Sequence, residues 1–323
     1  MGEAIVIIFL LEGATHVTMH RSKKSIQLLQ EKLSRTTRSL SSPENRKILR
    51  ISIASYCLFM VALNTLMILV CPFSKLRRDG YNELLLRLST VSSKEMVYFL
   101  QIMVHSSFVM LVLNLHVLYF SVFGYYFFVC FSMKQCLSGF VSKSRISIKQ
   151  QDYETVLKLY GEMREVIILA DSFLSFPAFI FVLIGMIGVF WYGCVIAFFP
   201  CGDLATSVFV FTGILHYSLM LLMVILPSAA VNDAAELALE VVVSLPDWFP
   251  QCYQELKIKI RREFKSQVAL TLWKIFKVKK PLLLNVVGIL ITYGFLLGAV
   301  GDFRVANEAK IASFSNYSKR YIE

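Results

Sequence analysis

Long apolar runs alternate with basic, polar segments along the chain. The clearest runs contain no lysine or arginine and cover residues 51–71, 97–132, 172–200, 204–231 and 281–301, with a weaker one at 4–19. An α-helix rises about 1.5 Å per residue, so about 20 residues cross a hydrocarbon core. No run shows the polar–apolar alternation of an outer-membrane barrel strand. The pattern predicts an all-α polytopic membrane protein with six transmembrane helices.

Two of these runs can each be interpreted in two ways. The run at 97–132 is long enough for two short spans, but no charge or proline lies between Glu95 and Lys134. Two helices would need a polar, turn-forming break, so we expect one tilted helix. The weak run at 4–19 has Glu3 before it and basic residues after it, the reverse of a signal peptide. This order favours a span, or its remnant, that enters the cytoplasm at its C-terminal end.

The distribution of charge predicts which way the chain sits. Apolar residues make up 56% of the 323 residues and charged residues 17%, and the 33 Lys+Arg gather between the apolar runs. That clustering argues against a soluble nucleic-acid binder. With six spans, alternate loops hold 24 basic residues on one side and 9 on the other. The positive-inside rule then predicts that the C-terminus lies outside the cell, and the sequon at Asn316 falls in this predicted external tail.

Two polar segments carry apolar positions at helical spacing. One covers residues 133–170 and continues the long helix; the other covers 232–280. We expect amphipathic helices there, whose apolar faces either pack into a small cytoplasmic bundle or lie on anionic headgroups beside basic residues such as Lys257 and Arg261. The apolar positions are Tyr153, Val156, Leu157, Tyr160, Met163, Val166 and Ile167 in the first segment, and Leu237, Leu239, Val242, Leu256, Ile258, Ile260, Phe264, Val268, Leu272 and Ile275 in the second.

The sequence carries few signs of catalysis or of a cofactor. Five histidines and seven cysteines show no zinc-ligand spacing, and there is neither a phosphate-binding glycine loop nor a glycine-flanked serine nucleophile. We therefore expect no enzyme, no metal site and no cofactor. Cys71 and Cys201 both fall near the predicted outer face, where a disulfide between them is one possibility.

The last third of the chain carries a pattern of a known family. The blocks Ala269–Phe276, Lys279–Leu284 and Gly288–Tyr293 resemble the C-terminal signature of arthropod gustatory receptors, members of the insect chemoreceptor superfamily. The family motif is Thr-Tyr, five apolar residues, then Gln-Phe. Thr292 and Tyr293 match it, whereas Ala299 and Val300 occupy the Gln-Phe positions. Family members have seven spans with the N-terminus inside, so the resemblance implies that a leading span is missing here.

The resemblance also implies a function. Relatives are ligand-gated cation channels in which four subunits surround a pore lined by the last helix, cytoplasmic segments form an anchor, and a tastant binds between the other helices near the outside. The corresponding division of this chain is residues 1–228 for ligand sensing, 229–280 for the anchor, 281–303 for the pore helix and 304–323 for an external tail. We expect a plasma-membrane chemoreceptor, homo- or heterotetrameric with related subunits, that conducts cations non-selectively.

Candidate site residues follow from this orientation. On the last helix a small, weakly polar stripe is the predicted pore lining and an apolar pair the predicted gate; a close helix contact is the alternative role of the stripe. The stripe is Asn285, Gly288, Thr292 and Ala299, and the gate is Phe295 and Leu296. Aromatic and polar residues in the outer halves of the other helices are the predicted ligand pocket, although such residues also suit ordinary packing. They are Asn64, His105, Phe108, Trp191, Tyr192, His216 and Tyr217.

Two other functions compete with the channel. One is a secondary transporter, which inverted repeats or paired broken helices would favour, and the halves of this chain show no self-similarity. The other is an N-terminally truncated receptor subunit that does not conduct.

Overall fold

The computed structural model describes residues 2–40, 47, 51, 54–55, 58–59, 61–63, 65–66, 94–198, 204–264, 266–289 and 291–292. Its helices are α1 (Gly2–Arg21), α2 (Lys23–Leu40), α5 (Lys94–Lys149), α6 (Tyr153–Phe198), α7 (Leu204–Val243), α8 (Leu245–Trp248) and α9 (Tyr253–Glu263), with a 3₁₀ turn at Pro250–Cys252. Strands β1 (Thr271–Leu272) and β2 (Phe276–Lys277) form an antiparallel hairpin. Residues 281–289 and 291–292 are helical and are called the last helix below.

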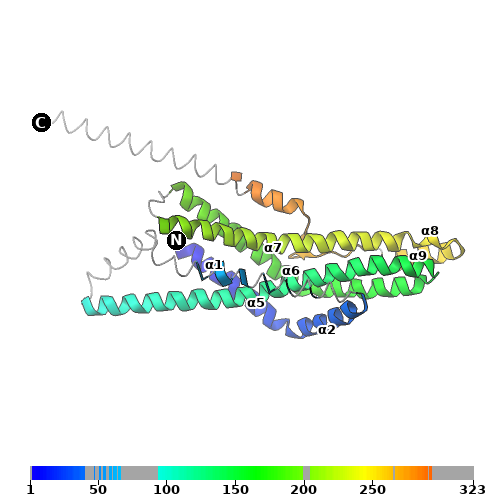
Figure 1. Cartoon of the computed structure of the whole chain (residues 1–323), viewed down its shortest axis with the longest axis horizontal. Helices are drawn as coiled ribbons and strands as arrows, with labels where there is room; N and C mark the ends of the chain where they lie inside the picture. The colour runs from blue at the N-terminus through cyan, green and yellow to red at the C-terminus, as the bar shows by residue number, and fades with distance from the viewer. Residues whose placement is uncertain are drawn as a thin grey trace, which may run out of the picture.

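Three long helices run along the molecule. Figure 1 shows α5, α6 and α7 side by side along the long axis, α8 and α9 at one end, and the last helix leaving the bundle near its middle. α5 is one continuous helix from Lys94 to Lys149, which confirms the single helix expected for the run at 97–132. That run lacks proline and charge, so nothing in it opens the backbone to water.

The turn between α5 and α6 is capped by a side chain. Gln151 has a φ of 59°, a conformation that lets the chain reverse. Asp152 then accepts a hydrogen bond from the Thr155 backbone N–H at 3.0 Å, as an N-cap does. Hydrogen bonds from Thr155 lower the pKa of Asp152 below its ordinary value. The cap fixes where α6 begins.

The sequence predicts one amphipathic helix over residues 133–170 that continues the long helix, but the turn after Lys149 divides this segment. Its second part, from Tyr153 on, belongs to α6, which joins it to the apolar run that follows. Val156, Tyr160, Met163 and Ile167 are all buried, as the helical spacing predicts. The helix continues through Pro177 to Phe198 without a break. This second part and the predicted span are therefore parts of one element.

The polar end of the molecule is a small helical bundle. Leu256 and Ile260 of α9 and Phe264, which directly follows it, form a buried face, and the Phe264 ring lies 5.0 Å from the Tyr160 ring of α6. Tyr153 meets Phe249 in the same manner, with ring centroids 5.5 Å apart. Of the two arrangements left open by the sequence, packing into a bundle is confirmed, and it occurs within one chain.

The helical prediction was wrong beyond α9. The sequence places Val268, Leu272 and Ile275 on a continuing helical face, but the helix ends at Glu263 and residues 271–277 form the hairpin. Buried positions there follow a spacing of two, with Leu270 and Leu272 inward. Long-range hydrogen bonds to α6 and α7 stabilise this extended backbone. A local apolar pattern does not reveal such bonds, so it could not predict the hairpin.

α2 covers α5 and α6. Its Leu29 and Leu33 are buried, and Lys32 pairs with Glu165 of α6 at 2.7 Å. Beneath α2, Cys136 is buried with its Sγ 3.3 Å from Thr37 Oγ1. Burial raises the pKa of the Cys136 thiol.

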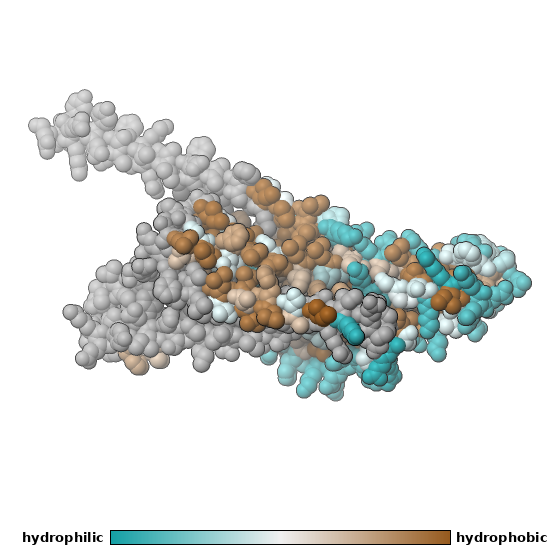
Figure 2. Space-filling view, in the orientation of Figure 1, coloured by the Kyte–Doolittle hydropathy of each residue, from teal (hydrophilic) through white to brown (hydrophobic). Residues whose placement is uncertain are grey.

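Surface polarity divides along the long axis. In Figure 2 apolar residues gather over the central part of α6, α7 and the last helix, and hydrophilic residues cover the end formed by α8 and α9. Among the described residues, the helices at Tyr153–Ile196 and Leu204–Val243 are long and apolar enough to cross a membrane. The apolar run at 51–71 and the end of the run at 281–301 lie largely outside the described residues. The number of spans stays a prediction.

Candidate functional site

The last helix faces away from its own bundle. Val286 is buried and Leu282 and Leu283 pack against the core, whereas the predicted pore residues Asn285, Gly288 and Thr292 are exposed. The Thr292 hydroxyl donates to the Gly288 carbonyl at 2.8 Å. Apolar side chains are exposed on this helix as well, namely Leu284, Val287, Ile289 and Ile291. The helix thus leaves both a polar stripe and an apolar surface open to other partners.

A tight β-hairpin comes immediately before the last helix. Thr271 pairs with Lys277 and Leu272 with Phe276, and the Ile275 N–H donates to the Leu272 carbonyl at 3.0 Å. Trp273 and Lys274, at the tip, have φ values of 48° and 57°. Two central residues with positive φ define a type I′ turn, which usually contains Asn-Gly. The fold therefore holds two bulky residues in a costly conformation here.

One buried amide holds both ends of the hairpin. Asn232 of α7 donates from Nδ2 to the Leu270 carbonyl at 2.9 Å and to the Val278 carbonyl at 2.8 Å. Its Oδ1 accepts from the Leu270 N–H at 2.7 Å. The side chain is only 2% exposed, so each of these bonds is made where water does not compete. We call these contacts the Asn232 clamp.

α6 holds the other side of the hairpin. The Asp171 carboxylate accepts from the Thr271 backbone N–H at 2.7 Å and from the Thr271 hydroxyl at 2.8 Å. The Trp273 N–H donates to the Ser175 carbonyl at 2.9 Å. The hairpin is thus hydrogen-bonded to two long helices at once.

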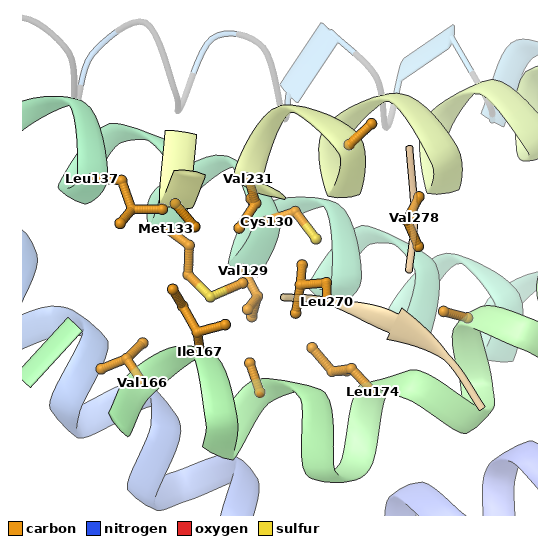
Figure 3. Close-up of a cluster of buried hydrophobic side chains, with 14 of the residues drawn as sticks. Val129, Cys130, Met133, Leu137, Val166, Ile167, Leu174, Val231, Leu270 and Val278 are labelled. Carbon is orange, nitrogen blue, oxygen red and sulfur yellow. The ribbon is translucent and has the colours of Figure 1, made fainter. Parts of the chain in front are cut away.

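The residues flanking the hairpin are part of the main core. Figure 3 shows Leu270 and Val278 between side chains of α5, α6 and α7, among them Val129, Cys130, Leu174 and Val231. Leu270 is 2% exposed and Val278 is fully buried. Just after the hairpin, Lys280 pairs with Asp233 of α7 at 2.8 Å. The start of the last helix is therefore fixed to the bundle by apolar packing, hydrogen bonds and an ion pair.

Aromatic rings interlock α6 and α7 nearer their other ends. Tyr192 of α6 lies over Gly213 of α7, where an added Cβ would be 2.4 Å from the ring. Tyr217 of α7 lies over Gly188 of α6, where a Cβ would be 2.3 Å away. The two tyrosine rings are 5.9 Å apart, and the His216 ring is 5.1 Å from that of Tyr217. Three of the predicted pocket residues, Tyr192, His216 and Tyr217, are therefore gathered in one place.

The other predicted site residues are not gathered with them by any described contact. Trp191 is 36% exposed. His105 and Phe108 lie in α5, with side chains outside the described part of the chain. Asn64, Cys71, Cys201, Tyr293, Phe295, Leu296 and Ala299 also lie outside it. These assignments stay predictions.

Two residues that matter for the geometry carry only a weak signal in the sequence. Asn232 is a lone amide that follows an uncharged apolar run, and Asp171 precedes another such run. A lone polar residue at the end of an apolar run is a weak signal, because most such residues are solvated. Within the described residues, no group of three His, Cys, Asp or Glu side chains is placed to hold a metal ion.

Comparisons with known proteins give one kind of match. No protein-family model matches the sequence, and no curated protein matches it. Among solved structures, the fold is similar to that of the insect olfactory receptor OR5 from Machilis hrabei, with a TM-score of 0.64. The similarity covers 91% of this chain and 79% of that chain at 11% identity. At this identity the similarity concerns the fold alone.

Proposed function

We propose that this chain is a chemosensory receptor of the insect chemoreceptor superfamily, gustatory in type, that acts as a ligand-gated non-selective cation channel in the plasma membrane. The observation that carries the proposal is the similarity in fold to an insect olfactory receptor over 91% of the chain. It agrees with the C-terminal resemblance to gustatory receptors at Thr292 and with the exposed polar stripe on the last helix. The active form is a tetramer with the last helices around its axis.

The contacts suggest how ligand binding reaches the pore. A tastant that binds beside Tyr192 and Tyr217 changes how α6 packs on α7, because both rings sit on glycines of the opposite helix. From Gly213 to Asn232, α7 is one continuous helix that extends about 28 Å at 1.5 Å per residue. At that distance the Asn232 clamp holds the hairpin that leads into the last helix. A shift of α7 is then transmitted to the base of the pore through packed, contiguous elements.

The proposal is tested by recording currents from cells that express the chain. A panel of tastants should evoke a cation current that is absent from cells without the chain. Cysteines introduced by Asn285→Cys, Gly288→Cys or Thr292→Cys should let a charged thiol reagent reduce this current, because these positions line the pore. Val286→Cys is the matched control, since Val286 is 4% exposed and packs against its own chain.

Each result bears on a different part of the proposal. Tastant-driven uptake of a substrate without a cation current would indicate a transporter instead. Equal block at Val286→Cys and Thr292→Cys would remove the polar stripe from the pore. If the chain reaches the cell surface as a tetramer but gives no current, it is a non-conducting receptor subunit.

A further inference from the structure

The tip of the hairpin exposes large apolar side chains. Trp273 is 51% exposed, Ile275 62% and Phe276 56%, and all three lie within four consecutive residues. The Trp273 ring packs against α6, with its centroid 5.1 Å from that of the Phe179 ring and 6.0 Å from that of the Phe176 ring. A short, exposed, apolar tip of this kind is unfavourable in water and indicates a partner.

The backbone at the tip of the hairpin is strained. A type I′ turn with Trp273 and Lys274 at its centre costs more than the usual Asn-Gly. The hydrogen bond from the Trp273 backbone N–H to the Ser175 carbonyl holds the strained residue in place. The fold thus keeps an aromatic and a basic side chain at the turn of the hairpin.

The hairpin lies where the apolar runs of two helices meet polar sequence. On α6 it contacts Asp171 and Ser175, at the start of the run 172–200. On α7 it is held by Asn232, directly after the run 204–231. If these runs cross a bilayer, the hairpin lies at the boundary between headgroups and hydrocarbon. Tryptophan is enriched at that depth because its ring is apolar and its N–H is polar.

The charge around the tip is positive. Lys274 and Lys279 are exposed and form no ion pair with the described residues, and Lys277 is half-buried. The two acidic side chains nearby have partners: Asp171 accepts hydrogen bonds from Thr271 and lies within electrostatic reach of Lys274, and Asp233 pairs with Lys280. An exposed apolar tip beside exposed lysines is complementary to an anionic membrane surface. A second copy of a chain with the same positive tip would bring like charges together instead.

We propose that the tip at residues 273–276 inserts into the headgroup region of the leaflet on the side of α8 and α9, and that Lys274 and Lys279 bind anionic lipid headgroups. The inference rests on the membrane insertion that the proposed function requires. It adds a lipid contact at the base of the last helix, where the lipid composition would influence the position of that helix.

Tryptophan fluorescence tests the insertion, because the chain has three tryptophans. Trp191→Phe with Trp248→Phe leaves Trp273 as the only one in the full chain, reconstituted in phosphatidylcholine vesicles. Nitroxide-labelled phosphatidylserine should quench Trp273 more strongly than equally labelled phosphatidylcholine. Lys274→Gln with Lys279→Gln should reduce this preference by up to about fivefold per lysine, the usual effect of one basic residue near an anionic surface. The same changes at Lys149 and Lys158, exposed near the polar end, should leave it unchanged.

The outcomes separate the inference from the proposed function. Quenching of Trp273 by aqueous iodide but not by lipid would place the tip in water. Quenching by neither would place it in a protein contact, such as one with a second copy. Either result overturns the inference, provided that the chain floats with the vesicles after an alkaline carbonate wash. Loss of the chain in that wash would overturn the membrane insertion itself.

Discussion

At the scale of single residues, the contact between α6 and α7 depends on glycines. Gly213 and Gly188 each accommodate a tyrosine ring of the opposite helix, and an added Cβ would lie well inside van der Waals contact of that ring. Gly193 is one residue from Tyr192, yet nothing lies within 4 Å of its Cβ position. Glycines in the same region therefore have different roles, which sequence alone does not distinguish.

We expect Gly213→Ala to lower the midpoint of thermal unfolding in detergent micelles. The methyl group displaces the Tyr192 ring, and overpacking of this kind typically costs about 1–3 kcal/mol. Gly193→Ala, the matched control, should leave the midpoint unchanged or raise it slightly, because alanine favours helix. Combining Gly213→Ala with Tyr192→Leu should restore part of the loss, since the shorter side chain leaves room. Equal midpoints for the two glycine variants would contradict the ring contact.

At the scale of elements, the hairpin depends on the Asn232 clamp. We expect Asn232→Ala to increase hydrogen exchange at the Leu270 amide, which donates to Asn232 Oδ1. The increase should be at least about fivefold, because leaving a buried group unpaired costs about 1–3 kcal/mol. Mass spectrometry of the peptide covering residues 266–280 would measure it. Asn285→Ala, at an exposed amide, should leave that exchange unchanged; protection that survives Asn232→Ala would show that packing alone holds the hairpin.

The elements also differ in how far the sequence predicts them. The buried face of α6, with Val156, Tyr160 and Met163, follows from local periodicity, and local periodicity is enough for one helix. The hairpin depends on bonds between residues far apart in the chain, 38 residues for Asn232 with Leu270 and 100 for Asp171 with Thr271. No local pattern reveals such pairs. The proximity of Tyr192 and Tyr217 could not be predicted either, because it depends on how α6 and α7 are aligned along each other.

The docking of α2 can be followed through the thiol beneath it. Leu33→Ala should speed the modification of Cys136 by a neutral maleimide, read from the peptide mass, because Leu33 is 3% exposed and truncating a buried leucine costs about 2–5 kcal/mol. The raised pKa of Cys136 leaves less thiolate than an ordinary cysteine has at pH 8. Loosening α2 lowers that pKa and so increases the rate further. Leu28→Ala, at a 44% exposed leucine, should have no effect; equal rates for both variants would mean that α2 does not shield the thiol.

At the scale of the whole molecule, the polarity of the surface and the sign of its charge together give the chain a direction. The hydrophilic end with α8 and α9 lies beyond the apolar surface of the long helices, as Figure 2 shows. The loops predicted to share that side hold 24 of the 33 basic residues, including those of α9. A bilayer around the apolar surface would leave this end in one aqueous compartment, and the basic residues favour the cytoplasm. The proposed pore and the proposed lipid contact both depend on this orientation.

Labelling of intact cells decides the orientation. A tag after Glu323 should bind antibody without permeabilisation, because the charge distribution predicts that the C-terminus lies outside the cell. Cys252, half-buried between α8 and α9, should react with a membrane-impermeant maleimide only after permeabilisation, with Cys252→Ser giving the background from other thiols. Two sites on opposite sides are needed, since a reagent that fails everywhere proves nothing. A tag reached only after permeabilisation, together with Cys252 labelled on intact cells, would reverse the orientation, and the tastant site would then face the cytoplasm.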